Sequence, residues 1–567
     1  MKDIKDRILV LIVIVFAITS ILVTYVMFNA SLEDDRQIIE DLSSAETSVS
    51  QNEIYVETDS KNDSSNPVAE VYENIPVVVP EIDTQEYSYR AEAEDTSMYG
   101  GLHTESSKEG YSGSGYVTGF SDTESGINRI IFYFYIPSLQ HYDVTLRYAV
   151  DENFKGYITI NGEKIGNIES GNTNGFTEKT FDGAFLEGGY AEIEIVHEEG
   201  DIDMDYIEVN NNTYVYENDN DVMKKLSNDN ASESAQNVMS YLVDAYGKGI
   251  ITGQYASSPA NTELEKIHDV TGRYPVIRFG AYTSDNDKNS AETDACADWS
   301  NNNGGIAGLM WYWNSPSGNP SIYASETDFD LKNAVTEKDI ALRDIDELEK
   351  MCKEGKISEE CLKLVKDIDE ISEQLKKLKK QNVPVLWRPL HEAGGEWYWW
   401  GSAGSEAYEW LWELLYKRQT VYHDLNNLIW VWNGQSKNYV VNENLYDIAA
   451  VDIYEGDEID YGSHFQQYKW LYVLTEKKKL VALSECGTIP DINEMFRDNA
   501  MFSFFGLWYG EYIMDENGNY SEQYTSEETL RNMYNSEGAI TLDEYVNKII
   551  PDELPTVETA VQTDKAE

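Results

Sequence analysis

The sequence predicts a multidomain protein in which a β-sandwich (jelly-roll) module precedes a (β/α)8 TIM barrel, behind an N-terminal transmembrane or signal segment. Three observations predict this order. Residues 8–28 carry no charge, residues 87–214 hold many short strand-like stretches, and residues 221–550 alternate short apolar runs with longer amphipathic stretches. Many short strands with turns between them favour a sandwich. Apolar runs separated by helices favour buried parallel strands.

The N-terminal segment, residues 1–30, predicts the compartment. Lys2, Lys5 and Arg7 precede the apolar run, and acidic residues follow it. The run is long enough to span a bilayer, which needs about 17–25 residues. The positive-inside rule then places the rest of the chain outside, as a membrane-anchored protein on the cell surface. A signal peptide cut near Ala30 is the alternative, and the protein would then be secreted.

Two acidic segments flank the predicted folded parts. Residues 31–86 are rich in Asp, Glu, Ser and Asn without a sustained apolar period, and we expect a disordered tether there. Residues 551–567 are expected to form a disordered tail. The whole chain carries 43 Lys+Arg against 102 Asp+Glu, a net charge of −59. This acidity argues against nucleic acid as a partner, because phosphate binding needs a basic face.

The predicted sandwich, residues 87–214, holds three short motifs in order: Tyr-Arg-Ala-Glu-Ala-Glu at 89–94, Gly-Tyr-Ser-Gly-Ser-Gly-Tyr-Val at 110–117, and Ile-Asp-Met-Asp-Tyr-Ile at 202–207. In this order they resemble a carbohydrate-binding module of family 35. The resemblance implies a structural calcium with Glu92, Glu94 and Asp205 as ligands, and carboxylate oxygens suit calcium. No Trp lies in this segment, so Tyr99 or Tyr111 would have to supply the flat ring that sugar-binding faces commonly offer.

The predicted barrel domain, residues 221–550, contains eight apolar runs, which is the number of strands in a TIM barrel. The runs are 249–254, 275–280, 305–313, 383–390, 427–433, 448–454, 479–485 and 501–509. Residues 315–382 form an insertion after the third run, with helices expected at 341–353 and 359–380. Cys352 and Cys361 lie on either side of a break at Gly355 and could pair in an oxidising compartment, which the sequence leaves open.

The ends of these runs predict an active site, because TIM-barrel sites lie at the C-terminal ends of the strands. Six runs end in aromatic, amide or carboxylate residues. Glu392 and Glu485 end the fourth and seventh runs, on opposing sides of the barrel mouth. Two carboxylates among aromatic rings suit a sugar held between an acid and a nucleophile.

Three stretches at these strand ends resemble glycoside hydrolase family 26: Arg388 to Glu392 with Trp397 after it, Asp452 to Tyr454, and the stretch from residue 483 to 487, together with Trp508. The resemblance implies a retaining endo-β-1,4-mannanase without a catalytic cofactor. Its substrate would be mannan, glucomannan or galactomannan. By position, Glu392 would be the acid/base and Glu485 the nucleophile. The substrate-binding residues would be His391, Arg388, Trp313, Trp397, Tyr454 and Trp508.

Two departures from the family pattern keep the polymer open. Tyr312 stands where mannanases often have a histidine, and Gly394 stands where they usually have an asparagine. β-1,3-Xylan and mixed-linkage β-glucan are therefore alternative substrates of the same fold. A polysaccharide-binding surface protein without catalysis is the alternative from another functional class.

Overall fold

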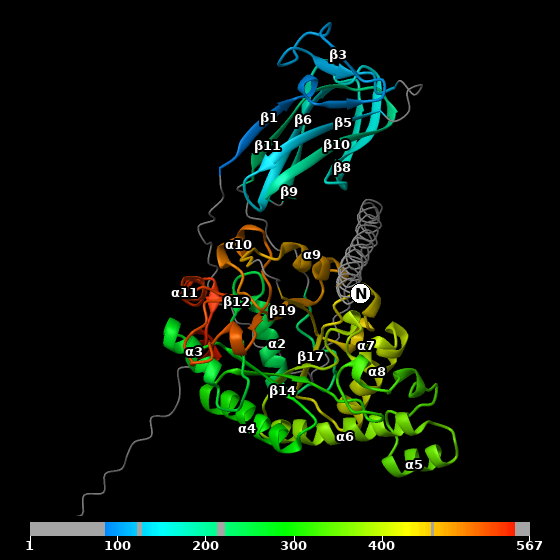
Figure 1. Ribbon diagram of the computed structural model, residues 1–567, viewed down its shortest axis with the longest axis vertical. Helices are drawn as coiled ribbons and strands as arrows, with labels where there is room; N and C mark the ends of the chain where they lie inside the picture. Colours follow the sequence, from blue (N-terminus) through cyan, green and yellow to red (C-terminus); the bar gives the residue numbers. More distant parts are fainter. Residues whose placement is uncertain (1–85, 122–127, 187, 213–221, 455–458, 550–567) are drawn as a thin grey trace, which may run out of the picture.

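The computed structural model describes residues 86–121, 128–186, 188–212, 222–454 and 459–549 (Figure 1). The predicted N-terminal segment, all but the last residue of the predicted tether, and the predicted tail lie outside these residues. Within the described ranges, no helix is long and apolar enough to cross a membrane. The predictions for the two ends of the chain therefore stay predictions.

The first folded part consists of two antiparallel sheets that pack face to face around an apolar core (Figure 1). One sheet has the order β3-β4-β11-β6-β9, with β1 also paired to β11, and the other has the order β2-β5-β10-β7-β8. The strands are β1 (Ser88–Glu92), β2 (Ser97–Tyr99), β3 (His103–Glu105), β4 (Tyr116–Thr118), β5 (Arg129–Ile136), β6 (Gln140–Ala149), β7 (Asn153–Ile160), β8 (Glu163–Gly171), β9 (Thr177–Leu186), β10 (Gly189–Gly200) and β11 (Asp203–Asn211). In β5 and β6, alternate side chains are buried, as a strand with one face on the core requires.

The second folded part is a closed barrel of eight parallel strands, which confirms the predicted barrel. The strands are β13 (Gly253–Tyr255), β14 (Ile277–Tyr282), β15 (Ile306–Trp311), β16 (Val385–Arg388), β17 (Leu428–Trp432), β18 (Ile448–Ile453), β19 (Leu480–Cys486) and β20 (Phe505–Leu507). The first predicted run is divided. Its start forms β12 (Ile250–Ile251), which pairs with β21 (Ala539–Ile540) outside the barrel, and its end forms β13.

Glycines make room for an aromatic ring inside the barrel. The Phe279 ring stacks on Tyr255 at 4.7 Å between centroids. A Cβ on Gly308 would lie 2.3 Å from the Phe279 ring, and one on Gly253 would lie 2.6 Å from it. Only residues without a side chain fit on the neighbouring strands, so these glycines set the packing beneath the site.

Helices surround the barrel (Figure 1). They are α2 (Glu233–Ala245), α3 (Thr262–Thr271), α4 (Asn286–Asn303), α5 (Ile345–Lys353), α6 (Glu359–Lys380), α7 (Trp399–Ser402), α8 (Ser405–Lys417), α9 (Phe465–Leu474), α10 (Ile492–Arg497), α11 (Glu527–Asn535) and α12 (Leu542–Ile549). In the insertion, α6 has the predicted bounds, whereas α5 begins four residues after the predicted start. The Ser358 side chain caps α6, whose first turn is acidic and whose last turn is basic, as the helix dipole favours.

Two further features bear on the sequence predictions. Cys352 and Cys361 are both free thiols, so the disulfide left open by the sequence does not form. The sandwich also contacts the barrel domain. His141 Nε2 lies 3.3 Å from the carbonyl oxygen of Asp498, and the rings of Phe185 and Phe465 lie 4.4 Å apart.

Candidate active site

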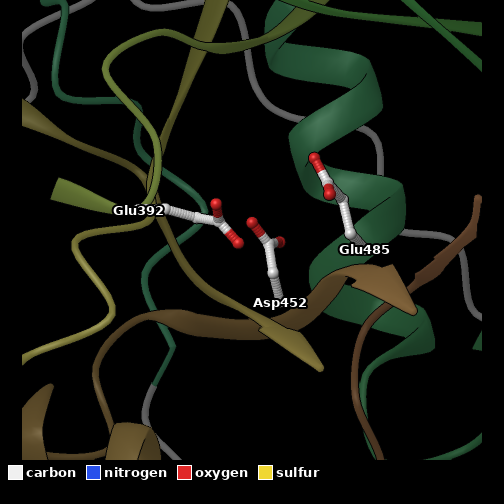
Figure 2. Close-up of side chains that lie close together, drawn as sticks. All are labelled: Glu392, Asp452 and Glu485. Carbon is white, nitrogen blue, oxygen red and sulfur yellow. The ribbon is translucent and has the colours of Figure 1, made fainter. Parts of the chain in front are cut away.

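Three carboxylates meet at the C-terminal end of the barrel (Figure 2). Glu392 follows β16, and Asp452 and Glu485 each lie one residue before the end of their strands, β18 and β19. Each contributes a carboxylate oxygen, and these oxygens lie within 4.8 Å of one another. The two predicted glutamates therefore come together, with a third carboxylate beside them.

A break in strand register aligns two of these carboxylates. Along β18 and β19, Val451 pairs with Leu483, but the next residue, Asp452, pairs with Glu485. Ser484 is the extra residue, and bulges of this kind re-aim side chains next to active sites. The Ser484 hydroxyl donates to Asp452 Oδ1 at 2.6 Å. Glu485 and Asp452 are thereby held side by side.

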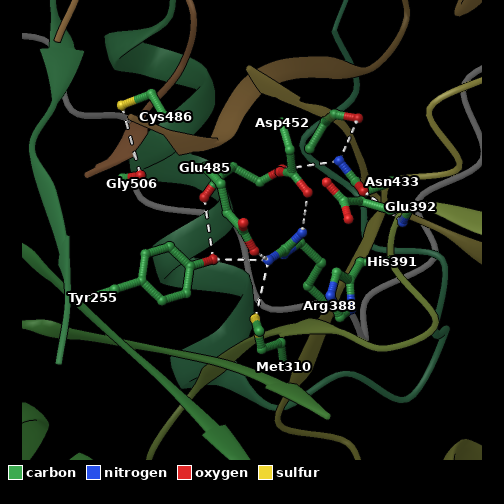
Figure 3. A network of polar contacts seen from close by, with 12 residues as sticks. Tyr255, Met310, Arg388, His391, Glu392, Asn433, Asp452, Glu485, Cys486 and Gly506 are labelled. Atoms are coloured by element: carbon green, nitrogen blue, oxygen red, sulfur yellow. Dashed lines mark hydrogen bonds and ion pairs between the residues drawn. The ribbon is translucent and has the colours of Figure 1, made fainter. Parts of the chain in front are cut away.

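Arg388 is the cation of the site (Figure 3). Its buried guanidinium donates from Nη1 to Asp452 Oδ2 at 2.7 Å and from Nη2 to the Tyr255 hydroxyl at 3.0 Å. Nη2 also forms an ion pair with Glu485 Oε1. One cation thus neutralises part of the charge of two buried anions. Removing one partner of such a pair would leave an uncompensated buried charge.

Glu485 has the contacts that a nucleophilic carboxylate needs. Its side chain is buried, and the Tyr454 hydroxyl donates to Oε2 at 2.7 Å. Burial raises the pKa of Glu485 to about 7, with a contribution from the charge of Asp452. Arg388 and the Tyr454 hydroxyl act in the opposite direction, because both favour the charged form.

Glu392 lies in a different environment. Burial raises the pKa of Glu392 to about 8, and the charges of Asp452 and Glu485 add to that effect. The residue adopts a left-handed backbone conformation, with φ of 53°, which is uncommon for a residue other than glycine. Its backbone N–H donates to the Asn433 side chain at 3.0 Å and to the Asn433 carbonyl at 2.8 Å. The two predicted catalytic carboxylates therefore differ in environment, with Glu392 the weaker acid.

His391 lies beneath these groups as a buried, neutral ring. Burial and the nearby Arg388 hold the pKa of His391 well below its usual range. Its ring contacts Tyr398 at 5.0 Å and Tyr312 at 5.5 Å between centroids. Nδ1 is buried and has no hydrogen-bond partner among the described residues. Burial thus leaves this nitrogen with an unsatisfied hydrogen-bonding capacity.

The predicted aromatic residues divide into two groups. Trp397 is 46% exposed, beside Gly395, and Trp508 packs on Tyr255 at 4.6 Å and on Tyr454 at 6.3 Å between centroids. Both are close to residues of the carboxylate site. Trp313 is instead only 2% exposed, and its Nε1 donates to Asp367 at 2.9 Å. The structure does not bring Trp313 to the carboxylates.

Three further residues belong to the site but were not assigned a role from the sequence. Asp452 stood in the motif at the end of the sixth run, yet its charge was not considered. Tyr255 ends the first barrel strand, and Asn433 follows the fifth. The signal that could have found all three is their position at strand ends, where TIM-barrel sites are built.

The predicted calcium ligands Glu92, Glu94 and Asp205 all accept hydrogen bonds from one turn of the sandwich, residues 112–115, although their oxygens do not all lie within 4.8 Å of one another. Glu92 accepts from the Ser112 hydroxyl at 2.5 Å, and Asp205 accepts from the Ser112 backbone N–H at 2.8 Å. Glu94 Oε1 accepts from the Ser114 backbone N–H at 2.5 Å, while its Oε2 is buried without a partner among the described residues. Asp205 also forms an ion pair with Arg147. The unpaired buried oxygen of Glu94 is what a hard cation would satisfy.

Comparison with protein families identifies the barrel domain. The model described as glycosyl hydrolase family 26 matches residues 227–544, more than half of the chain. The chain belongs to glycosyl hydrolase family 26. This confirms the resemblance noted in the sequence.

Relatives in the family match over most of this chain. A protein named mannan endo-1,4-beta-mannosidase from Thermothelomyces thermophilus is 30% identical over 476 residues, which are 80% of this chain and 89% of that protein. Mannan endo-1,4-beta-mannosidase B from a Piromyces species is 30% identical over 468 residues, which are 78% of this chain and 76% of that protein.

A solved structure supports the identification of the sandwich. The chain is similar to the GH26-CBM35 β-(1,4)-mannanase of Podospora anserina, with 29% identity and a TM-score of 0.55 over 81% of this chain and 99% of that one. This match is longer than the family 26 barrel alone, so it includes the sandwich. It supports the predicted resemblance of the sandwich to carbohydrate-binding module family 35.

The raised pKa values predict an unusual dependence of stability on pH. A carboxyl whose pKa is higher in the folded state binds more protons there, so its contribution to the unfolding free energy falls as pH rises from about 4.5 to about 8. We expect Glu392→Gln to raise the melting temperature at pH 8, because it removes the cost of the buried charge. The increase should be about 2–4 °C for each kcal/mol of unfolding free energy regained, and smaller at pH 5. Differential scanning calorimetry at both pH values measures this.

The matched control is Glu406→Gln, at an exposed glutamate in α8. This substitution removes an exposed charge and relieves no buried one, so it should not raise the melting temperature at pH 8. Equal shifts for Glu392→Gln at pH 5 and pH 8 would contradict the assigned environment of Glu392.

Proposed function

We propose that this protein is a retaining endo-β-1,4-mannanase that cleaves mannan-type polysaccharides by double displacement. The short separation of Glu392 and Glu485 carries the proposal. A retaining enzyme needs its two carboxyl groups about 5–5.5 Å apart, whereas an inverting enzyme needs about 6.5–9.5 Å to admit a water. One oxygen of each carboxylate lies within 4.8 Å of one oxygen of the other, which is compatible with the shorter distance. The relatives named as mannan endo-1,4-beta-mannosidases support mannan as the substrate.

In the first step, Glu485 attacks the anomeric carbon and forms a glycosyl-enzyme. The ion pair with Arg388 and the hydrogen bond from Tyr454 favour the ionised form of Glu485, which makes this attack. Glu392 gives its proton to the leaving glycosidic oxygen, which its raised pKa allows near neutral pH. The Tyr454 hydroxyl stays protonated, because burial and the charge of Glu485 raise its pKa.

In the second step, a water hydrolyses the glycosyl-enzyme, and Glu392 takes the proton of that water. Ester formation removes the negative charge of Glu485. That charge is one of the causes of the raised pKa of Glu392, so the pKa of Glu392 falls. The same carboxyl can therefore act first as an acid and then as a base.

The second candidate keeps this mechanism and changes the polymer to β-1,3-xylan or mixed-linkage β-glucan. It rests on Tyr312, whose ring lies 5.5 Å from that of His391 and replaces the histidine of many mannanases. Digestion of a panel of polysaccharides, with sizing of the products, separates the two. Membership in family 26 and the paired glutamates set aside a binding protein without catalysis.

We also propose that the two folded parts work outside the cell, held there by residues 1–30. The proposal rests on the uncharged run and its flanking charges. Cell fractionation tests it. Recovery of the whole chain in the cytosol would contradict it.

The retaining mechanism predicts the anomer of the first product. Proton NMR during cleavage of mannan should show retention of the β-anomer before mutarotation, and an inverted anomer would contradict the role of Glu485.

Glu485→Ala should abolish turnover. Glu392→Ala should slow mannan cleavage far more than cleavage of activated aryl mannosides, because their leaving groups need little protonation.

We propose that the sandwich binds calcium through Glu92, Glu94 and Asp205. A ligand that binds only the folded state adds RT ln(1 + [L]/Kd) to stability, about 2.7 kcal/mol at 100 times Kd. Calcium should raise the melting temperature of the full-length protein, and a chelator should lower it. Glu94→Gln should weaken this response, whereas Glu163→Gln, at an exposed residue of β8, should leave it unchanged. A melting temperature unaffected by calcium and chelator would refute the site.

A further inference from the structure

A cavity lies apart from the carboxylate site. It has a volume of about 250 Å³ and lies between the end of β15 and the helices α4 and α6, which pack together. Its walls include the apolar side chains of Trp311, Trp313 and Ile371. Exposed residues such as Asn286 contribute to its lining, so it opens to solvent.

The alternation of side chains along the chain separates this cavity from the active site. Tyr312 points toward His391, as their ring contact shows. Trp311 and Trp313 lie on the other face, where their rings stack at 4.2 Å and 8°. None of the three carboxylate residues of the active site lines the cavity. The two spaces thus share one stretch of chain but open on opposite faces of it.

Two carboxylates, those of Asp367 and Glu370, lie among the polar groups of the cavity. Asp367 accepts from Trp313 Nε1 through Oδ2, and within the described residues its Oδ1 accepts no hydrogen bond. The Asn286 side chain donates to Glu370 Oε1, which leaves the amide oxygen and the second carboxylate oxygen available. Burial raises the pKa of Asp367 to about 6, so its carboxylate is ionised above that pH.

The two carboxylates and the apolar side chains of the cavity together indicate which class of ligand it would bind. Two carboxylates disfavour an anion. The edges of the Trp311 and Trp313 rings and of Ile371 line the cavity and offer apolar contacts that a bare metal ion would not use. A sugar ring satisfies both kinds of wall, because its C–H groups pack on apolar side chains and its hydroxyls donate to the carboxylates.

We propose that this cavity is a second sugar-binding site, which takes one neutral pyranose unit of the substrate. The inference rests on the proposed function, since the substrate polysaccharide supplies the sugar. Asp367 and Glu370 accept hydrogen bonds from its hydroxyls, and the wall of Trp311, Trp313 and Ile371 packs against its carbon face. The site holds substrate without touching the catalytic carboxylates.

Calorimetric titration with mannotriose tests the site. The full-length protein carries Glu485→Gln, so that the sugar is bound and not cleaved. Asn286→Trp, added to this parent, fills the cavity from its rim. The matched control is Ala291→Trp, at an exposed position of the same helix that does not line the cavity. We expect Asn286→Trp to remove one class of binding site that the parent and the control retain.

Asp367→Asn supplies a variant of nearly equal shape. Its side-chain oxygen can still accept from Trp313, but the charge is lost. We expect it to weaken the same class of site roughly tenfold, as loss of a charge-assisted hydrogen bond does. Equal numbers of sites and equal affinities in all four proteins would overturn the inference.

Failure of this inference and failure of the proposed function give different results. The chain with Glu485 intact should cleave mannan whether or not it carries Asn286→Trp. If mannan is cleaved but Asn286→Trp removes no binding, only the second sugar site is wrong. If the intact chain does not cleave mannan, the proposed function is wrong.

Discussion

The active site depends on one buried cation, Arg388, that lies between two buried anions. Isolated ionised carboxylates are strongly disfavoured in a protein interior unless they are paired and hydrogen-bonded. Arg388 pairs with both Asp452 and Glu485, and its neighbour Tyr255 accepts a further bond from it. One positive charge does not balance two negative ones. The remaining charge contributes to the raised pKa of Glu392, after the larger effect of burial.

The strands of the barrel position the side chains that form these ion pairs. Arg388 ends β16, and the two anions come from β18 and β19, so the guanidinium reaches across the barrel mouth (Figure 3). The extra residue at Ser484 aligns Glu485 with Asp452, and the Ser484 hydroxyl bonds Asp452. Without that bulge, the regular one-for-one register of β18 and β19 would pair Asp452 with Ser484 instead. A local irregularity thus determines which carboxylates share the cation.

The sequence was sufficient for the barrel and for the meeting of Glu392 and Glu485, because buried parallel strands are apolar and their ends converge. It was not sufficient for details that depend on register. The bulge at Ser484 has no sequence signature, so the contact of Asp452 with Glu485 was not foreseen. Burial and the charge of Asp452, which a sequence does not reveal, raise the pKa of Glu392 more than the charge of Glu485 does. Trp313 was predicted to bind substrate, although alternation with Tyr312 was already a signal that the two side chains point apart.

Asp452, the third carboxylate of the site, is compatible with both steps of the proposed mechanism. With Glu392 protonated, Arg388, Asp452 and Glu485 together carry one net negative charge. This charge favours the proton on Glu392 and disfavours a second anion in the site. When Glu485 becomes an ester, Arg388 and Asp452 alone remain, and their charges cancel. Asp452 therefore leaves Glu392 facing a neutral pair instead of an unpaired guanidinium, which would form a strong ion pair with Glu392 and weaken it as a base.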